Sequence, residues 1–143
     1  MSTKLWGGRF DMPTNKLVEQ YNATITLEQR LCPFDIQGSI VHATMLGRQG
    51  IITQDEANTI IRGLRQVSKE IEDGQFIFDT VDEDIHMAIE RRMTEIIGPV
   101  GGKLHTGRSR NDQTTVDSKM HKRAIIRDIQ EDITNLQKII INK

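Results

Sequence analysis

The stretch from Asn111 to Lys143 reads NDQTTVDSKMHKRAIIRDIQEDITNLQKIIINK and contains neither glycine nor proline. Its later apolar residues step by three and four positions, the heptad spacing of a helix that packs against other helices: Ile126, Ile129, Ile133, Leu136 and Ile140. A helix of about 30 residues is about 45 Å long, at roughly 1.5 Å per residue. We therefore predict one long helix that the other helices are too short to cover, so its apolar seam needs partners from elsewhere.

Helical periodicity also governs the chain upstream of this stretch. After Pro33 the apolar residues recur every three or four positions, and a helix is predicted to end near Gly50, which favours a left-handed terminus. Thr53 and Glu56 have the spacing of a capping box, in which each side chain bonds the backbone of the other residue. An apolar stripe over residues 57–71 follows them. These patterns predict two amphipathic helices in succession.

A third helix is predicted over residues 85–97. Thr80 and Glu83 repeat the capping-box spacing before it, and Gly98-Pro99 follows as a stop signal. Isoleucine is abundant and favours strands, but runs of 15 or more residues at 3.6-residue spacing cannot bury one face of a strand. With 4% aromatic residues and three prolines, an all-β sandwich is disfavoured. The predicted fold class is all-α.

The predicted helices divide the chain unequally. We expect a small helical N-terminal domain over residues 1–110, followed by the first long helix of a central helical bundle over residues 111–143. The sequence ends at Ile141-Asn142-Lys143 with no convincing C-cap. The pattern favours a segment of a larger helical bundle, whose remainder is supplied by further sequence or by other chains.

Composition excludes several classes of protein. Nineteen Lys and Arg against 20 Asp and Glu give a net charge of −1, which argues against a general nucleic-acid or membrane-surface binder. Cys32 is the only cysteine, so an internal disulfide and a thiolate zinc site are both impossible, and a reduced, cytoplasmic setting is favoured. No uncharged run approaches the ~20 apolar residues that a membrane span needs, and the N-terminus lacks a secretory core.

Residues 101–113, GGKLHTGRSRNDQ, are the most unusual segment. Its glycines permit close backbone approach, its cations are Lys103, Arg108 and Arg110, and a helix begins at its end. Guanidinium groups beside a helix N-terminus suit a carboxylate or a phosphate. The alternative is that Ser109 or Asn111 only caps the helix while the arginines pair with acids on neighbouring helices. A nucleotide-binding P-loop is excluded, because leucine follows Gly102-Lys103 where Ser or Thr is required.

A run of acidic residues, DTVDEDIH, spans residues 79–86. The helix dipole accounts for most acids at a helix start. His86 follows Asp84 by two positions, and a nearby carboxylate could fix its tautomer for hydrogen bonding or proton transfer. A solvated or capping histidine is the alternative. No second histidine lies at a spacing that would place both on one helix face, so no metal site is expected.

Other features have simpler explanations. The segment Trp6–Phe10 is either an ordered arm over a site or an anchor for a loose end. His42 and His121 are expected to be structural or solvent-facing, and Cys32 to be a small buried apolar residue. No Ser-His-Asp or Cys-His grouping favours nucleophilic catalysis.

Three motifs together point to a family. KLWGGRF at 4–10, DEDIH at 82–86 with ERR at 90–92, and GKLHTGRSRNDQ at 102–113 occur in this order. With these motifs the chain resembles the N-terminal part of the argininosuccinate lyase family, which is related to fumarase and aspartase. The RSRNDQ run argues against the related adenylosuccinate lyases and fumarases. The resemblance implies an all-helical, homotetrameric, cytoplasmic enzyme of arginine biosynthesis that needs no metal or organic cofactor.

The resemblance also implies a reaction and a set of site residues. Family members eliminate across a C–N bond of argininosuccinate and release arginine and fumarate. Substrate-binding roles carry over by motif to four residues: Thr24, Ser109, Arg110 and Asn111. Thr24 stands where the family usually has a serine, so a hydroxyl is retained with an added methyl group. Asp84 and His86 would be active-site supports, near a base from another subunit.

The catalytic groups of the family have no counterpart in this sequence. The loop with Met-Pro-Gln-Lys-Lys that carries the proposed catalytic serine, and a Thr-His pair, both lie farther along the family's chain. No catalytic residue is therefore assigned here, and the 143-residue chain alone is predicted to be inactive. The alternatives are a crystallin-like structural member of the family, against which intact Asp84 and Asn111 argue weakly, and a stand-alone anion-binding helical module.

Overall fold

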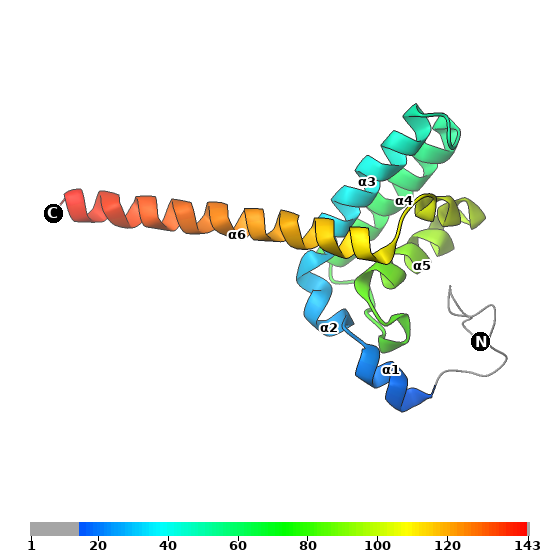
Figure 1. Ribbon diagram of the computed structural model, residues 1–143, viewed down its shortest axis with the longest axis horizontal. Helices are drawn as coiled ribbons and strands as arrows, with labels where there is room; N and C mark the ends of the chain where they lie inside the picture. Colours follow the sequence, from blue (N-terminus) through cyan, green and yellow to red (C-terminus); the bar gives the residue numbers. More distant parts are fainter. Residues whose placement is uncertain (1–14, 143) are drawn as a thin grey trace.

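The structure is a computed structural model that describes residues 15–142. Every regular element in this range is helical, so the predicted all-α class is confirmed (Figure 1). The α-helices are α1 Lys16–Asn22, α2 Ile25–Glu28, α3 Cys32–Arg48, α4 Gln54–Glu72, α5 Ile85–Ile97 and α6 Arg110–Ile141. Short 3₁₀ segments are η1 Gln29–Leu31, η2 Thr80–Asp82 and η3 Pro99–His105. The segment Trp6–Phe10 lies outside the described residues.

The core lies where α3, α4 and α5 pack together. α3 and α4 form a helical hairpin, and α5 lies against α4 (Figure 1). Close approach depends on glycine: a Cβ at Gly63 of α4 would lie 2.8 Å from Ile97 and 2.9 Å from Met93, both on α5. The largest completely buried apolar side chains are Ile25 of α2 and seven from these three helices: Leu46, Ile60, Leu64, Val67, Ile85, Ile89 and Met93.

The predicted cap of α4 is confirmed, whereas α5 spans the predicted residues but its predicted cap is wrong. Thr53 accepts a bond from the backbone N–H of Glu56, whose carboxylate accepts from the backbone N–H of Thr53. The N-cap of α5 is Asp84, whose Oδ1 accepts from the backbone N–H of Met87 at 2.7 Å. Glu83 has a left-handed φ of 63°, which breaks any helix that runs from Thr80 into α5.

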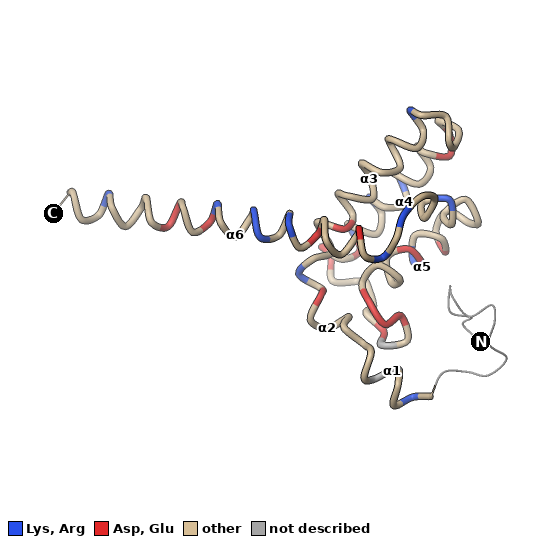
Figure 2. The backbone as a smooth tube through the Cα atoms, in the orientation of Figure 1, with Lys and Arg blue, Asp and Glu red and all other residues tan. Residues whose placement is uncertain are grey.

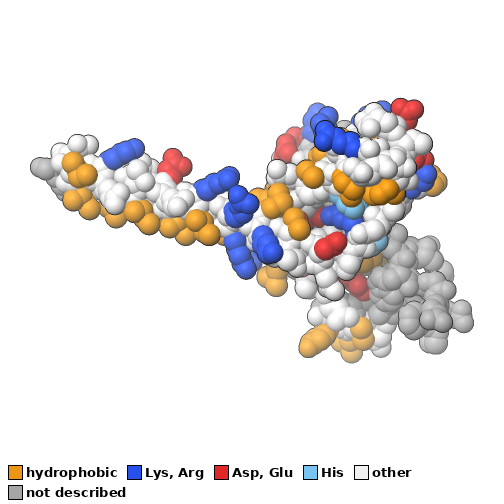
Figure 3. All heavy atoms as spheres, turned by 45° about the horizontal axis from the view of Figure 1, so that its top comes forward, with side chains coloured by type: hydrophobic (Ala, Val, Ile, Leu, Met, Phe, Trp, Pro, Cys, Tyr) orange, Lys and Arg blue, Asp and Glu red, His pale blue; other side chains and the backbone are white. Residues whose placement is uncertain are grey.

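The long helix α6 is packed only at its beginning. Gln113 and Asp117 are 5% and 1% exposed, and α6 contacts α3 there. Beyond this point α6 projects from the body of the molecule (Figure 1). The predicted apolar seam is exposed in the described chain: Ile126 54%, Ile129 50%, Ile133 51%, Leu136 57% and Ile140 64%. Figure 3 shows this row of apolar side chains, and Figure 2 shows charges of both signs along the same helix.

The short helices α1 and α2 carry too few turns to produce a periodic pattern in the sequence. Across residues 15–142, no helix combines the length and the apolar character that crossing a membrane requires.

Candidate active site and a buried Asp-His-Asp cluster

The loop between η3 and α6 is held against α3 by two contacts. The Nε2–H of His42 donates to the carbonyl oxygen of Thr106 at 3.0 Å, and Arg108 Nη1 donates to Ser39 Oγ at 2.9 Å. Burial lowers the pKa of His42, which keeps the ring neutral near pH 7. Gly107 turns the chain at a φ of 67° between these two anchors. α3 therefore fixes where α6 begins.

Ser109 caps α6. Its Oγ accepts from the backbone N–H of Asn111 at 3.2 Å, and the Asp112 carboxylate accepts from the backbone N–H of Ser109 at 3.0 Å. The capping alternative for Ser109 is therefore confirmed. α6 begins at Arg110, one residue before the predicted start. Asn111 is exposed, and its side-chain amide has no hydrogen-bond partner among the described residues.

Arg110 is oriented by two neighbours, and one of its guanidinium nitrogens has no partner among the described residues. Its Nε lies 3.0 Å from Asp84 Oδ2, and its Nη1 donates to Gln113 Oε1 at 2.7 Å. The Nη2 group has no partner within residues 15–142, and the side chain is 31% exposed. The alternative that the arginines only pair with acids on neighbouring helices therefore holds for Arg110 but not for Arg108. Arg108 bonds a serine hydroxyl rather than an acid.

Asp84 joins the start of α5 to the start of α6. One carboxylate oxygen caps α5 and the other pairs with Arg110. The preceding turn is also fixed, because Glu83 O accepts from the backbone N–H of Thr24 at 2.8 Å. Thr24 is exposed beside this turn, although no contact joins its hydroxyl to Arg110 or Asn111. Lys103, the remaining cation of the segment, pairs with Glu56 instead.

His86 is neither solvated nor a cap, which corrects the sequence expectation. It is 2% exposed, and its Nδ1 lies 2.9 Å from Asp35 Oδ1 on α3. Asp117 Oδ2 on α6 lies 3.6 Å from the same nitrogen. The carboxylates beside His86 therefore come from Asp35 and Asp117, and not from Asp84, whose oxygens are engaged by Met87 and Arg110.

Electrostatics in this cluster favour uptake of positive charge. The pKa of Asp117 is raised to about 7, chiefly by burial and then by the charge of Asp35, against the opposing charges of His86, Arg108 and Arg110. Burial lowers the pKa of His86, but its hydrogen bond and charge interaction with Asp35 outweigh burial and leave the pKa raised. Gln113 Nε2 donates to Asp35 Oδ1 at 3.4 Å, so Gln113 bridges this cluster and Arg110.

Sequence reasoning missed Asp35 and Asp117. His86 is separated from them by dozens of residues, so no local spacing reveals the group. One signal was available: Asp35 and Ser39 are polar at i and i+4 on the helix face that also carries Ile36 and Ala43. The expectation that the chain has no metal site rested on histidine spacing alone. In the structure, Asp35, His86 and Asp117 place their donor atoms within 4.8 Å of one another.

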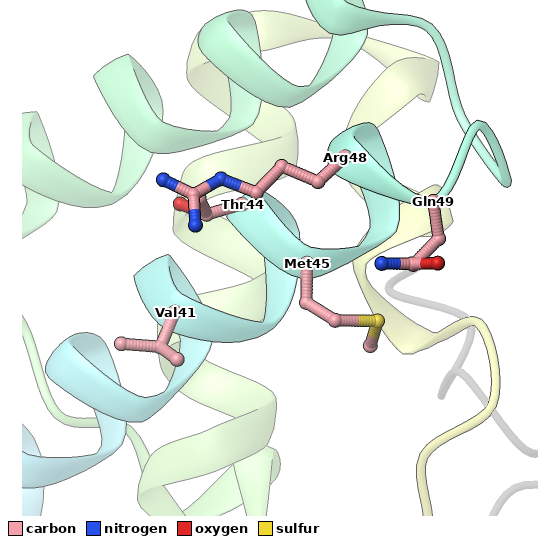
Figure 4. A pocket seen from close by; sticks show the side chains of 5 residues that line it. All are labelled: Val41, Thr44, Met45, Arg48 and Gln49. Atoms are coloured by element: carbon pink, nitrogen blue, oxygen red, sulfur yellow. The ribbon is translucent and has the colours of Figure 1, made fainter.

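A surface pocket lies away from these residues. It is lined by side chains at the C-terminal end of α3, shown in Figure 4: Val41, Thr44, Met45, Arg48 and Gln49. None of the site residues described above lines it. The pocket therefore contributes nothing to the candidate site.

Comparison with known proteins identifies the family. Residues 8–143 match the family model described as Lyase. The chain belongs to this lyase family. It is 49% identical to the argininosuccinate lyase of Syntrophotalea carbinolica over 143 residues, which cover 100% of this chain and 31% of that protein. The argininosuccinate lyase of Staphylococcus carnosus is 48% identical over 99% of this chain and 31% of the relative.

A third relative gives the same result over a shorter range. The argininosuccinate lyase of Heliobacterium mobile is 56% identical over 123 residues, 86% of this chain and 27% of its own length. The resemblance found in the sequence motifs is confirmed, and this lyase-family chain corresponds to the N-terminal part of such enzymes. The chain spans about a third of the length of the curated relatives that it matches.

Proposed function

We propose that this chain is the N-terminal, substrate-carboxylate-binding part of an argininosuccinate lyase, which splits argininosuccinate into arginine and fumarate in arginine biosynthesis. The observation that carries the proposal is the free edge of Arg110. Its guanidinium is held by Asp84 and Gln113, while Nη2 has no partner among the described residues, and the exposed Asn111 follows in the first turn of α6. A preorganised guanidinium fork binds a carboxylate with little loss of side-chain entropy.

The surroundings favour an anion at this position. The N-terminus of α6 has a positive dipole end, and Arg108 adds a second cation in the same loop. The hydroxyl of Thr24 is exposed beside the turn that positions Asp84, where it can add a neutral donor. Ser109 acts through the cap, since its hydroxyl accepts from the backbone of Asn111.

The chemistry divides between binding and proton transfer. Elimination requires a base that removes a proton beside a carboxylate, stabilisation of the resulting aci-carboxylate, and departure of the guanidino nitrogen. Arg110 and Asn111 bind and orient the carboxylate end of the substrate. Asp84 and His86 support them: Asp84 orients Arg110, and His86 acts through Asp35 and Gln113. The acid and base come from sequence beyond residue 143, so the chain alone is inactive.

The rest of the proposal concerns the setting of the molecule. The exposed seam of α6 packs against equivalent helices in a homotetrameric, cytoplasmic enzyme. The partners are small molecules, with no role for nucleic acid or a membrane, because the net charge is −1. No metal or organic cofactor takes part in the proposed reaction.

Calorimetry with argininosuccinate and with fumarate tests the binding role. We expect Arg110→Gln to weaken binding of each ligand at least tenfold, because the fork to the carboxylate is lost. The matched control is Arg123→Gln, which removes an exposed arginine farther along the same helix. Equal affinities for wild type and Arg110→Gln would refute the binding role. Fumarate release from the isolated chain, measured by ultraviolet absorbance, would refute its predicted inactivity.

A further inference from the structure

Three potential metal ligands meet where α3, α5 and α6 come together. They are Asp35, His86 and Asp117, one from each helix, and their donor atoms all lie within 4.8 Å of one another. His86 Nδ1 is 2.9 Å from Asp35 Oδ1 and 3.6 Å from Asp117 Oδ2. Ligands of one zinc ion, at about 2.0–2.2 Å from the metal, are separated by roughly 3.0–3.6 Å. The two distances at His86 fall close to that range.

The carboxylate of Asp117 lacks the partners that a buried charge requires. The side chain is 1% exposed, and neither Oδ1 nor Oδ2 accepts a hydrogen bond within the described chain. Oδ1 faces the backbone of Gly38, where an added Cβ would lie 3.8 Å away. A buried carboxylate without donors is costly unless it pairs with a cation or coordinates a metal.

The charge balance of the cluster leaves room for a divalent cation. Asp35 and Asp117 place two carboxyl groups in the interior beside one imidazole, and a metal ion that displaces their protons would be held by two carboxylates. Arg110 forms no direct ion pair with either carboxylate, because its Nε pairs with Asp84 and its Nη1 bonds Gln113, although its charge acts on Asp117 from a distance. Arg108 is directed to the hydroxyl of Ser39. One divalent ion would compensate both carboxylates at once.

We propose that Asp35, His86 and Asp117 form a zinc site that joins α3, α5 and α6. An imidazole nitrogen with two carboxylates is a donor set that Zn²⁺ accepts, and two free oxygens on Asp117 allow it to bind through both. Mg²⁺ is disfavoured, because it retains several waters and a nitrogen ligand suits it poorly. The burial of all three side chains makes the role structural: the ion ties the start of α6 to the body of the molecule.

This site is separate from the carboxylate-binding role of Arg110. Zinc would contact Asp35, His86 and Asp117, whereas the carboxylate contacts Arg110 and Asn111, so zinc binding and fumarate binding are measured separately even though His86 supports Arg110 through Asp35 and Gln113. Gln113 is the one bridge between them, through its bonds to Asp35 and Arg110.

Metal titration of the chelator-treated 143-residue chain tests the site. We expect one equivalent of Zn²⁺ by calorimetry, a rise of several degrees in the thermal midpoint, and visible absorption bands when Co²⁺ is used instead. Asp117→Asn should weaken Zn²⁺ binding at least tenfold. The matched control, Asp128→Asn, removes an exposed acid on the same helix and should leave binding unchanged. Far-UV circular dichroism establishes that both variants are folded.

Two further measurements separate this site from surface binding. His105 lies 3.4 Å from Glu90 and is exposed, so His105→Gln removes the obvious surface alternative and should not alter Zn²⁺ affinity. X-ray absorption of the wild-type complex should give oxygen and nitrogen ligands with one imidazole, and this readout does not depend on any variant folding. Absence of binding at millimolar Zn²⁺, binding that survives Asp117→Asn, or a ligand set with two imidazoles would each overturn the proposal.

Discussion

At the scale of single residues, two arginines on α5 tie neighbouring segments to the core. Arg92 bonds both oxygens of Glu70 on α4, from Nε at 2.7 Å and from Nη2 at 2.9 Å. Arg91 makes the equivalent pair with Asp82, at 2.8 Å and 2.7 Å. Both are forked contacts, in which one planar guanidinium fixes one carboxylate. They fix the segment before α5 and the end of α4 relative to α5.

The Glu70–Arg92 pair predicts an acid-dependent loss of stability. The hydrogen bonds from Arg92 hold the pKa of Glu70 below its usual range. Such a group stabilises the fold above about pH 4.3 and ceases to do so as the pH falls through the lowered pKa. We expect Glu70→Gln to cost roughly 0.5–1 kcal/mol at pH 7, since Arg92 is partly exposed.

Urea unfolding at several pH values measures this dependence. The difference between wild type and Glu70→Gln should shrink as the pH falls below about 4.3 and disappear once Glu70 is protonated in the folded chain. The exposed Glu72, which accepts a bond from Ser68 and pairs with no arginine among the described residues, provides the matched control Glu72→Gln. A cost that stays constant from pH 7 to pH 3 would show that the charge of Glu70 is irrelevant.

At the scale of elements, the N-terminus of α6 combines a structural and a functional role. Ser109 accepts from the N–H of Asn111, so its hydroxyl orders the first turn that carries Arg110. Ser109→Ala should destabilise the fold by about 1 kcal/mol, the usual cost of losing a cap, whereas Ser109→Asp should retain most of it. Chemical denaturation of the two variants measures the difference. Equal stability of the Ala and Asp variants would exclude a capping role.

Local patterns explain which elements could be predicted from the sequence. The cap of α4 followed from Thr53 and Glu56, because both partners of that interaction lie within one turn. At α5 the same spacing, between Thr80 and Glu83, predicted the wrong cap. Asp84 lies directly before the first apolar residue of the helix and caps it instead. The cluster around His86 escaped because its carboxylates arrive from α3 and α6, and contacts between distant segments leave no spacing to read.

The candidate loop was found from composition, but the partners within it were not. Glycines and arginines in residues 101–113 were sufficient to suggest an anion site. Asp84 and Gln113 determine which nitrogens of Arg110 are engaged, and Asp84 belongs to the start of another helix, α5. Ser39, which anchors the loop, was also missed, and the partner of His42, expected to be structural or solvent-facing, was not predicted, because both partners lie more than 60 residues away.

At the scale of the whole molecule, the chain has two unlike parts. One is a packed helical body, and the other is the projecting part of α6, whose isoleucine and leucine side chains are at least 42% exposed. A continuous apolar row of this kind is typical of an interface rather than of a solvated surface. The first turns of α6 belong to the body, because Gln113 and Asp117 are buried there.

The exposed row predicts self-association of the isolated chain through α6. We expect sedimentation velocity to show oligomers at micromolar concentration, and Ile133→Glu to shift them towards monomer, because a charge within an apolar helix interface is strongly unfavourable. Asn135→Glu adds the same charge on the opposite face of the helix and should leave association unchanged. Ile133 is 51% exposed in the monomer, so its replacement should leave the helical body folded. A chain that remains monomeric at high concentration, or equal effects of the two glutamates, would show that this row is not what brings the chains together.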